Sequence, residues 1–473
     1  MKRSTRVLTA MLLVVVLGVL AVPFGVHYGP QLAEALQERA PEPEPSVPAI
    51  QQAPEEVAAP TLVSRLDSGA PMPAPEVLAP LLNEALQVPG GTPVTGVVLD
   101  AATGESLFDQ GGAELQLPAS NIKLLTATAV LARIDPDRRL TTSVHRAGTG
   151  NVLVLKAGGD ALLGSGESNP EAIVGRAGLA TLAARTAEAL TGGGPYQLVL
   201  DDTLFVGPVL NASWQEGDIQ AGEIAPIYPL AINSSWLDES KQGGARADDA
   251  ALAAAASFRE ALISEGIEVV EGIERQAAPE EATLVAAVES ATVEEQVEHM
   301  LLTSDNYLAE VLARLAAEAS GPPASFGGGL ETIAEVINGL ELETEGMVFG
   351  DASGLSPRNR VTPQQLAGVV RILLRSDNRA LRHVLHGLPI ASLSGTLAGR
   401  YNDDDAPTFA GAGLVRAKTG TLNAVTALSG YVVSADGRLL VFSFIASGLD
   451  GTTAPARDAV DAAAAVLAGC GCR

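Results

Sequence analysis

The alternation of hydrophobic and polar positions predicts β-strands near both ends of the chain. Around 93–110, the stretch "PVTGVVLDAATGESLFDQ" places two apolar runs on either side of an Ala-Ala-Thr-Gly turn, which is typical of a β-hairpin. A second antiparallel pair is predicted on either side of Ala435-Asp436-Gly437. The Ala-rich segment Pro455–Leu467 is predicted to form a helix.

The middle of the chain has a different pattern. Residues from about 145 to 290 alternate short apolar strands with Ala-rich helices. We therefore predict an α/β protein in which an inserted smaller domain, 146–289, interrupts a larger domain built from 86–145 and 290–469. The larger domain is expected to hold an antiparallel sheet flanked by helices.

The N-terminus has the pattern of an export signal. Lys2, Arg3 and Arg6 precede an apolar run from Val7 to about Val26, which is long enough to span a bilayer as a helix. The positive flank should stay in the cytoplasm, so the rest of the chain would lie outside. No clear small-residue cleavage site follows, and residues 1–30 are predicted to be a transmembrane signal anchor, with a cleaved signal peptide as the alternative.

The segment that follows, 31–85, is rich in Pro, Glu and Ala and predicts an extended tether. The whole chain has 473 residues and a formal net charge of -26, which argues against nucleic acid as a partner. The five histidines have no metal-ligand spacing, so we expect no metal and no cofactor. Cys470 and Cys472 lie in a short tail, 470–473, and a disulfide, a ligand pair or two free thiols all remain open.

A lysine interrupts an apolar helical pattern in "PASNIKLLTA", residues 118–127. Lysine is seldom fully buried without a partner. Ser120 precedes Lys123 by three positions, so both side chains would lie on one face of a helix. Lys123 could be a surface residue on a first turn that Ser120 caps, or the two could be a nucleophile and its base.

Two further motifs bear on this choice. Ser304-Asp305-Asn306 is predicted to form a turn between two apolar helices, the first of which begins at a capping box of Thr292 and Glu295. Lys418-Thr419-Gly420-Thr421 is predicted at the exposed end of an edge strand. Each alone could be a plain connector or a surface strand. In the order SxxK, SxN, KTG, the three motifs are typical of penicillin-binding proteins and class A β-lactamases.

The chemistry of an acyl transfer explains these residue types. A serine hydroxyl needs a base, and Lys123 can serve if burial and the nearby charge of Lys418 lower its pKa. Ser304 would relay a proton to the leaving group, and backbone N–H groups of Ser120 and Thr421 would form an oxyanion hole. The predicted catalytic residues are Ser120, Lys123 and Ser304. The predicted substrate-binding residues, which would hold the substrate backbone and carboxylate, are Asn306, Lys418, Thr419, Gly420 and Thr421.

The sequence resembles the D-alanyl-D-alanine carboxypeptidases/endopeptidases of the class C low-molecular-mass penicillin-binding proteins, peptidase family S13. Besides the three motifs, the resemblance rests on these stretches: "LVLKAGGDALL", "LVLDDTLFVGP", "GDASGLSPRNRVTP" (350–363), "LPIASLSGTLAGR" (388–400) and "AKTGTLNAVTALSGYV" (417–432). It implies a serine transpeptidase/β-lactamase-like domain and an acyl-enzyme route. It also implies peptidoglycan stem peptides ending in D-Ala-D-Ala as substrates and β-lactam antibiotics as covalent inhibitors.

The sequence departs from the family pattern at a few positions. Ala352 stands where glycine is usual, and Ala161 stands where proline is usual. The segment between Lys123 and Ser304 is short for the family, so we expect one inserted domain where some relatives carry two.

The sequence argues against three other functions. A serine β-lactamase shares the motifs, but the long insertion before Ser304 argues against that class. A wall-binding or sensor protein would not need the intact catalytic set. A Ser-His-Asp hydrolase would need a G-x-S-x-G elbow, and the sequence contains none. The prediction is therefore a penicillin-binding D-Ala-D-Ala carboxypeptidase, a DD-endopeptidase, or both.

Overall fold

The computed structural model describes Met11, Val15, Val19 and residues 69–472, except 89, 91, 92, 149, 191, 193, 405 and 450. The predicted anchor at 1–30, apart from those three residues, and the predicted tether up to residue 68 lie outside the described residues. Among the residues that are described, no helix is both long and apolar enough to cross a membrane. The fold reported below belongs to one compact unit, Arg65–Arg473.

Strands from both ends of the chain form the first sheet, which is antiparallel and has the order β2-β1-β10-β9-β8. Its strands are β1 (Thr95–Asp100), β2 (Ser106–Gln110), β8 (Arg416–Leu422), β9 (Val425–Val433) and β10 (Leu439–Ser447). Both predicted antiparallel pairs are confirmed, since β1 pairs with β2 and β9 pairs with β10.

Helices cover both faces of this sheet, which is why β1 is buried along its whole length. Val97 and Leu99 pack into a core with α10 (Pro363–Arg375), while Val98 points to the other face. On that other face lie α2 (Pro75–Ala85) and α12 (Thr453–Gly469), so the predicted C-terminal helix is confirmed. Helix α2 corrects the prediction of an extended tether over 31–85 for its last part, because Leu78 and Leu82 are buried in this core. The predicted α/β class therefore holds for this part of the chain.

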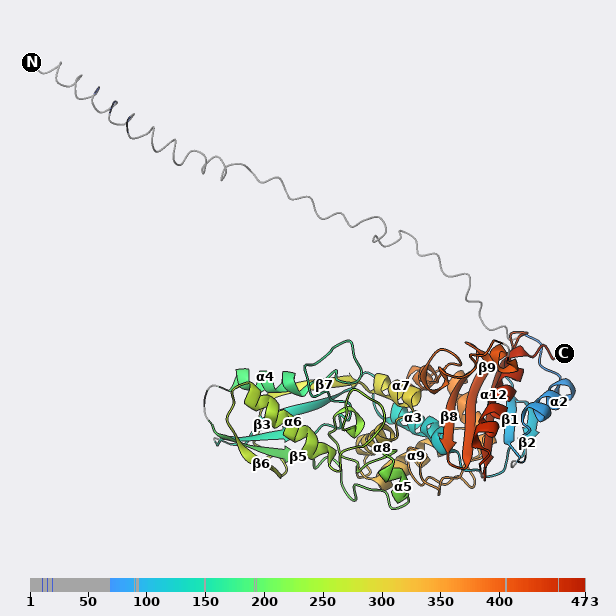
Figure 1. Ribbon diagram of the computed structural model, residues 1–473, viewed down its shortest axis with the longest axis horizontal. Helices are drawn as coiled ribbons and strands as arrows, with labels where there is room; N and C mark the ends of the chain where they lie inside the picture. The colour runs from blue at the N-terminus through green and yellow to red at the C-terminus, as the bar shows by residue number, and fades with distance from the viewer. Residues whose placement is uncertain are drawn as a thin grey trace, which may run out of the picture. The chain divides into compact units, whose positions relative to one another are not determined.

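The core beside the first sheet is helical. It contains α3 (Ile122–Arg133), α7 (Val293–Thr303), α8 (Asn306–Ser320), α9 (Phe326–Asn338) and α11 (Arg379–His386). Helix α3 is buried from Ile122 to Leu131, as its apolar sequence predicts, and it packs against the other four helices. In Figure 1, α3 and α8 lie between the first sheet and a second one.

The second sheet is mixed and has the order β6-β5-β4-β3-β7. Its strands are β3 (Arg139–Arg146), β4 (Val152–Lys156), β5 (Tyr196–Asp201), β6 (Val269–Arg275) and β7 (Thr283–Thr292). Strands β4, β5 and β6 run parallel, and β3 pairs antiparallel with β4 and β7. Helices α4 (Leu179–Ala189) and α6 (Ala250–Ser264) share a core with it (Figure 1). The division into domains at 146 and 289 stays a prediction.

Two contacts join segments from the two ends of the chain, one at the helices that cover the first sheet and one at the end of β1. Cys470 and Cys472 form a disulfide, which settles the open question of their state, and the Cys472 carbonyl accepts a 2.7 Å hydrogen bond from the N–H of Ala74 at the start of α2. Asp100, which is fully buried, forms an ion pair with Arg438 on the loop before β10.

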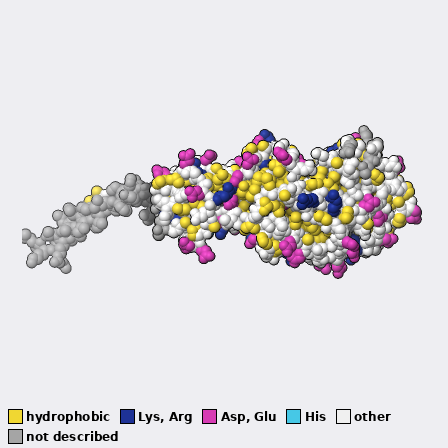
Figure 2. All heavy atoms as spheres, turned by 90° about the horizontal axis from the view of Figure 1, so that it is seen from below, with side chains coloured by type: hydrophobic (Ala, Val, Ile, Leu, Met, Phe, Trp, Pro, Cys, Tyr) yellow, Lys and Arg dark blue, Asp and Glu magenta, His cyan; other side chains and the backbone are white. Residues whose placement is uncertain are grey.

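The acidic side chains visible in Figure 2 are scattered over the face shown there and form no single patch.

Candidate active site

The turn before α3 presents Ser120 to a cleft. Ala119–Asn121 form a short 3₁₀ turn, in which Ala119 is buried and has a φ of 46°. Gly354 packs directly on this turn: a Cβ at Gly354 would lie 2.1 Å from the Ala119 carbonyl oxygen, so only glycine fits there. Ser120 is partly exposed, while its neighbours on both sides are buried.

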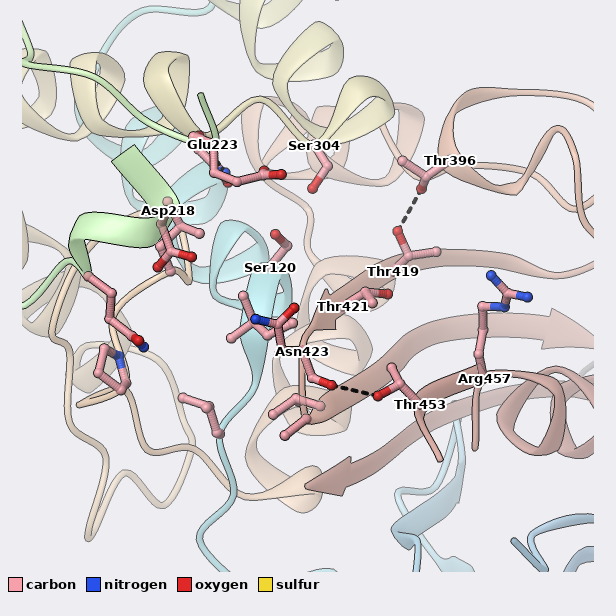
Figure 3. A pocket seen from close by; sticks show the side chains of 18 of the residues that line it. Ser120, Asp218, Glu223, Ser304, Thr396, Thr419, Thr421, Asn423, Thr453 and Arg457 are labelled. Atoms are coloured by element: carbon pink, nitrogen blue, oxygen red, sulfur yellow. Dashed lines mark hydrogen bonds between the residues drawn. The ribbon is translucent and has the colours of Figure 1, made fainter. Parts of the chain in front are cut away.

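A cleft of about 890 Å³ opens above Ser120. Figure 3 shows Ser120, Ser304, Thr419 and Thr421 facing the same space. Other residues of the lining are Asn306, Asp218, Glu223, Thr396, Arg400, Asn423, Thr453 and Arg457. No group of three or more His, Cys, Asp or Glu side chains that could hold a metal ion occurs in the described part of the chain.

Lys123 lies behind Ser120 and is fully buried, so the interpretation of a surface lysine on a capped first turn is wrong. Its Nζ is 3.0 Å from Ser120 Oγ, 2.6 Å from Asn306 Oδ1 and 2.5 Å from the carbonyl oxygen of Ser353. Burial lowers the pKa of Lys123 from 10.5 to about 8, although nearby carboxylates, Asp351 foremost, act in the opposite direction.

The three partners of Lys123 determine what a neutral amine can do here. A neutral amine has two N–H donors and one lone pair. The oxygens of Asn306 and Ser353 can only accept a hydrogen bond, so each takes one N–H. The lone pair is then left for the hydroxyl of Ser120, which has a proton to give. The arrangement suits proton transfer from Ser120 to Lys123.

The second predicted motif lies between α7 and α8. Ser304 ends α7 with a φ of 60°, and Asp305 caps α8 by accepting from the N–H of Leu308. Ser304 Oγ is 2.9 Å from the Nζ of Lys418, which also donates to the carbonyl oxygen of Thr419 at 2.9 Å. The hydroxyl of Ser304 is thus tied to the third motif on β8.

One expectation about Lys418, that it lies at the exposed end of its strand, is corrected by its position. It is fully buried and does not line the cleft, whereas Thr421 is exposed, because the side chain of Lys418 turns inward toward Ser304. Burial and then the charge of Lys123 hold the pKa of Lys418 well below 10.5.

The outer edge of β8 faces the cleft. The N–H of Ala417 donates to Pro389, away from the neighbouring strand β9. Because backbone N–H groups alternate sides along a strand, those of Thr419 and Thr421 point to the same outer edge. A Cβ at Gly420 would lie 2.8 Å from Asn121 Nδ2, so glycine allows β8 to approach the Ser120 turn closely.

Asn306 joins the motifs to the loop that carries Glu223. Its Oδ1 accepts from Lys123, and its Nδ2 donates to the carbonyl oxygen of Glu223 at 3.0 Å. Thr419 is also held in place, since its hydroxyl is 2.6 Å from that of Thr396. The structure therefore brings together all the predicted site residues, with Lys123, Lys418 and Gly420 outside the cleft lining and the others in it.

Sequence reasoning missed a group of buried acids near Lys123. Glu310 on α8 accepts from the N–H groups of Ala352 and Ser353, both at 2.9 Å, and Asp351 lies beside them. The one available signal was a glutamate within the apolar stretch "YLAEVLARL" of α8. Ala352 is not among the positive-φ residues, so its backbone conformation does not require glycine.

A family model and two known relatives match most of this sequence. The model of the D-Ala-D-Ala carboxypeptidase 3 (S13) family matches residues 78–243 and 237–468. Carboxypeptidase DacB of Mycolicibacterium smegmatis is 35% identical over 426 residues, which cover 90% of this chain and 91% of that protein. A carboxypeptidase of Mycobacterium tuberculosis is 32% identical over 442 residues, which cover 92% and 91%.

Solved structures show the same fold. Penicillin-binding protein 4 (dacB) of Haemophilus influenzae has a TM-score of 0.67 at 20% identity, covering 80% of this chain and 97% of that one. A structure of the same protein with a β-lactam has a TM-score of 0.60 at 21% identity, covering 78% and 93%. The first family match contains Ser120 and Lys123, and the second contains Ser304 and Lys418. The chain therefore belongs to the D-Ala-D-Ala carboxypeptidase 3 (S13) family and is a serine-type carboxypeptidase, as the sequence predicted.

Proposed function

We propose that this protein removes the terminal D-Ala from peptidoglycan stem peptides through an acyl-enzyme on Ser120, with Lys123 as the base. The observation that carries the proposal is the set of three contacts at Lys123 Nζ, which leaves its lone pair for Ser120. A lysine with a pKa of about 8 has a substantial neutral fraction near neutral pH, which this role needs.

The first half of the reaction forms the ester. The peptide lies along the open edge of β8, and the hydroxyls of Thr419 and Thr421 bind its terminal carboxylate. Lys123 takes the proton of Ser120 while Oγ attacks the carbonyl carbon of the penultimate D-Ala. The oxyanion is bound by the N–H groups of Ser120 and Thr421, in agreement with the outward direction of the Thr421 N–H.

The second half releases the products. Ser304, which accepts a hydrogen bond from Lys418, gives its proton to the nitrogen of the leaving D-Ala and takes up the proton that Lys123 received from Ser120, so the amine of Lys123 is neutral again. Water then occupies the place of the leaving amine and attacks the ester, while its proton passes to the lysine base. As the ester breaks, Lys123 returns that proton to Ser120 Oγ, so the starting state is restored and one water is consumed for each peptide bond broken.

A β-lactam should trap the ester. The β-lactam amide and carboxylate mimic the end of the peptide, and the opened ring keeps the leaving group in place, so water is excluded. A β-lactam complex of the structurally similar Haemophilus influenzae protein supports this. Intact mass spectrometry should show one added penicillin, and peptide mapping should place it on the fragment that contains residues 118–123. Ser120→Ala should not form it.

Other outcomes of that experiment favour other functions. Rapid clearance of penicillin would favour a β-lactamase, and neither adduct nor turnover would favour a sensor protein. An adduct on Ser304 would mean that the nucleophile is misassigned. Incubation of the protein with defined muropeptides, followed by product masses, separates loss of terminal D-Ala from cleavage of crosslinks.

We further propose that residues 1–30 hold the protein at the outer face of the cell membrane, with the Pro/Glu/Ala-rich segment as a tether. The apolar run after Lys2, Arg3 and Arg6 supports this. The full-length protein should fractionate with membranes and resist carbonate washing. A mature protein in the medium that starts near residue 30 would show a cleaved signal peptide instead.

A further inference from the structure

The carbonyl group of Ser353 fixes one of the two N–H groups of Lys123, yet it belongs to a turn far away in the sequence. The two residues are separated by 230 positions, and the bond is 2.5 Å long. A shift of this carbonyl would let the amine rotate and would turn its lone pair away from Ser120. The position of the turn 351–354 is therefore a condition for proton transfer.

Helix α8 and Asp351 hold this turn from two sides. Glu310, which is only 2% exposed, accepts with one oxygen from the N–H groups of both Ala352 and Ser353. Asp351 accepts from the N–H of Gly354, which is in the same peptide plane as the Ser353 carbonyl. Because Glu310 lies one helical turn after Asn306, α8 supplies one acceptor of Lys123 directly and supports the other.

We propose that Glu310 is a positioning residue for acylation: it anchors the turn at Ala352 and Ser353, so that the Ser353 carbonyl takes one N–H of Lys123 and the lone pair faces Ser120. The inference rests on the function proposed above for Lys123. Glu310 does not line the cleft, so it acts through Lys123 and not on the substrate.

The hydrogen-bonding pattern of Glu310 can be reproduced without a charge. Burial and the neighbouring Asp351 raise the pKa of Glu310 to about 8, while its hydrogen bonds and Arg314 act in the opposite direction. A neutral carboxyl and an amide each present one carbonyl oxygen as an acceptor. Glu310→Gln can therefore keep both bonds to the turn, whereas Glu310→Leu loses both and keeps a similar volume.

The test measures acylation by a fluorescent penicillin in stopped flow, with the rate expressed per active site titrated at the end point. Glu310→Leu should lower the acylation rate constant at saturation by about 10- to 100-fold, as expected when a catalytic group is misplaced by about 1 Å. The dissociation constant of the initial complex should change less than about twofold, because the cleft is untouched. Glu310→Gln should restore the rate to within about threefold of the wild type.

Asp201 on β5 provides a matched control. It is buried and accepts from the N–H groups of Ala278 and Thr203 at 2.9 and 3.1 Å, but it does not line the cleft. Asp201→Leu should lower the melting temperature and the number of active sites, and leave the rate per site unchanged.

Three results would overturn or redirect the inference. A wild-type rate per site in Glu310→Leu would show that Glu310 only supports the fold. A Glu310→Gln variant that is ten times slower than the wild type would also overturn it, even if the leucine variant fails to fold. Near-wild-type acylation by Lys123→Arg would refute the base itself, whereas a slow Lys123→Arg beside a normal Glu310→Leu refutes the positioning role alone.

Discussion

The pH dependence of acylation follows from the buried position of Lys123. Only the neutral amine can accept the proton of Ser120, and the pKa of Lys123 is about 8. The neutral fraction is then about 9% at pH 7 and about 91% at pH 9, so the acylation rate should rise about tenfold between these values and then level off. At the ordinary lysine pKa, the neutral fraction at pH 7 would be about 300-fold lower.

The assay is the second-order rate constant of acylation by a fluorescent penicillin, measured from pH 6 to 10 at constant ionic strength. The end-point titre at each pH corrects for any unfolded protein. Lys123→Arg is the control, because a guanidinium stays protonated throughout this range. It should show no rise centred near pH 8 and should be about 10²–10⁴-fold slower at pH 9.

Two results would refute this reasoning. A midpoint near 10.5 would mean that burial does not lower the pKa of Lys123. A rate that is flat from pH 6 to 9 in the wild type, or that falls as the pH rises, would mean that loss of a proton from Lys123 does not limit acylation.

Two other predictions concern single charges. Glu223 is exposed, and its carboxylate is one of the charges that raise the pKa of Lys123. Glu223→Gln should therefore move the midpoint of the pH profile of the saturating acylation rate to lower pH. A shift of this midpoint to higher pH, or the same shift in the exposed control Glu216→Gln, would contradict the prediction. Asp100→Ala removes the carboxylate that pairs with the buried guanidinium of Arg438 and should lower the free energy of unfolding in urea by about 3–5 kcal/mol. Glu335→Ala, at an exposed ion pair, should lower it by less than about 1 kcal/mol. Because the pKa of Asp100 is lowered from 3.8, its carboxylate stabilises the fold at neutral pH, and this stabilisation is lost as the pH falls below 3.8. An equal loss in the free energy of unfolding for Asp100→Ala and Glu335→Ala at pH 7 would refute the argument.

Local patterns predicted the elements that carry the site. Alternation gave β1, β2, β9 and β10, and the apolar run after Asn121 gave α3. The contact between Ser120 and Lys123 followed from their spacing on a helix, and the capping box of Thr292 and Glu295 correctly placed the start of α7. These inferences need only the geometry of neighbouring residues.

Features that depend on distant contacts could not be predicted in this way. Nothing near Lys418 in the sequence shows that its side chain turns inward to Ser304, which is 114 positions away. The support of the Ser353 turn by Glu310 joins residues about 42 positions apart, and no local periodicity encodes it. The balance of burial and carboxylates at Lys123 likewise required the folded arrangement of four separate acids.

Strand β8 is an edge strand of the first sheet, and this position limits which chains can pair with the backbone beside Ser120. An exposed sheet edge is a template for any passing strand, and it commonly leads to self-association. Here the part of the edge nearest Ser120 lies within a cleft, with Asp218 and Glu223 lining it on one side and Thr396 on the other (Figure 3). Before Lys418 this edge is already occupied, because the N–H of Ala417 donates to the carbonyl oxygen of Pro389 and the N–H of Ala391 donates to that of Val415. The length of edge left beside Ser120 is therefore short, and we expect it to favour pairing with a single extended peptide over pairing with the edge strand of another folded protein.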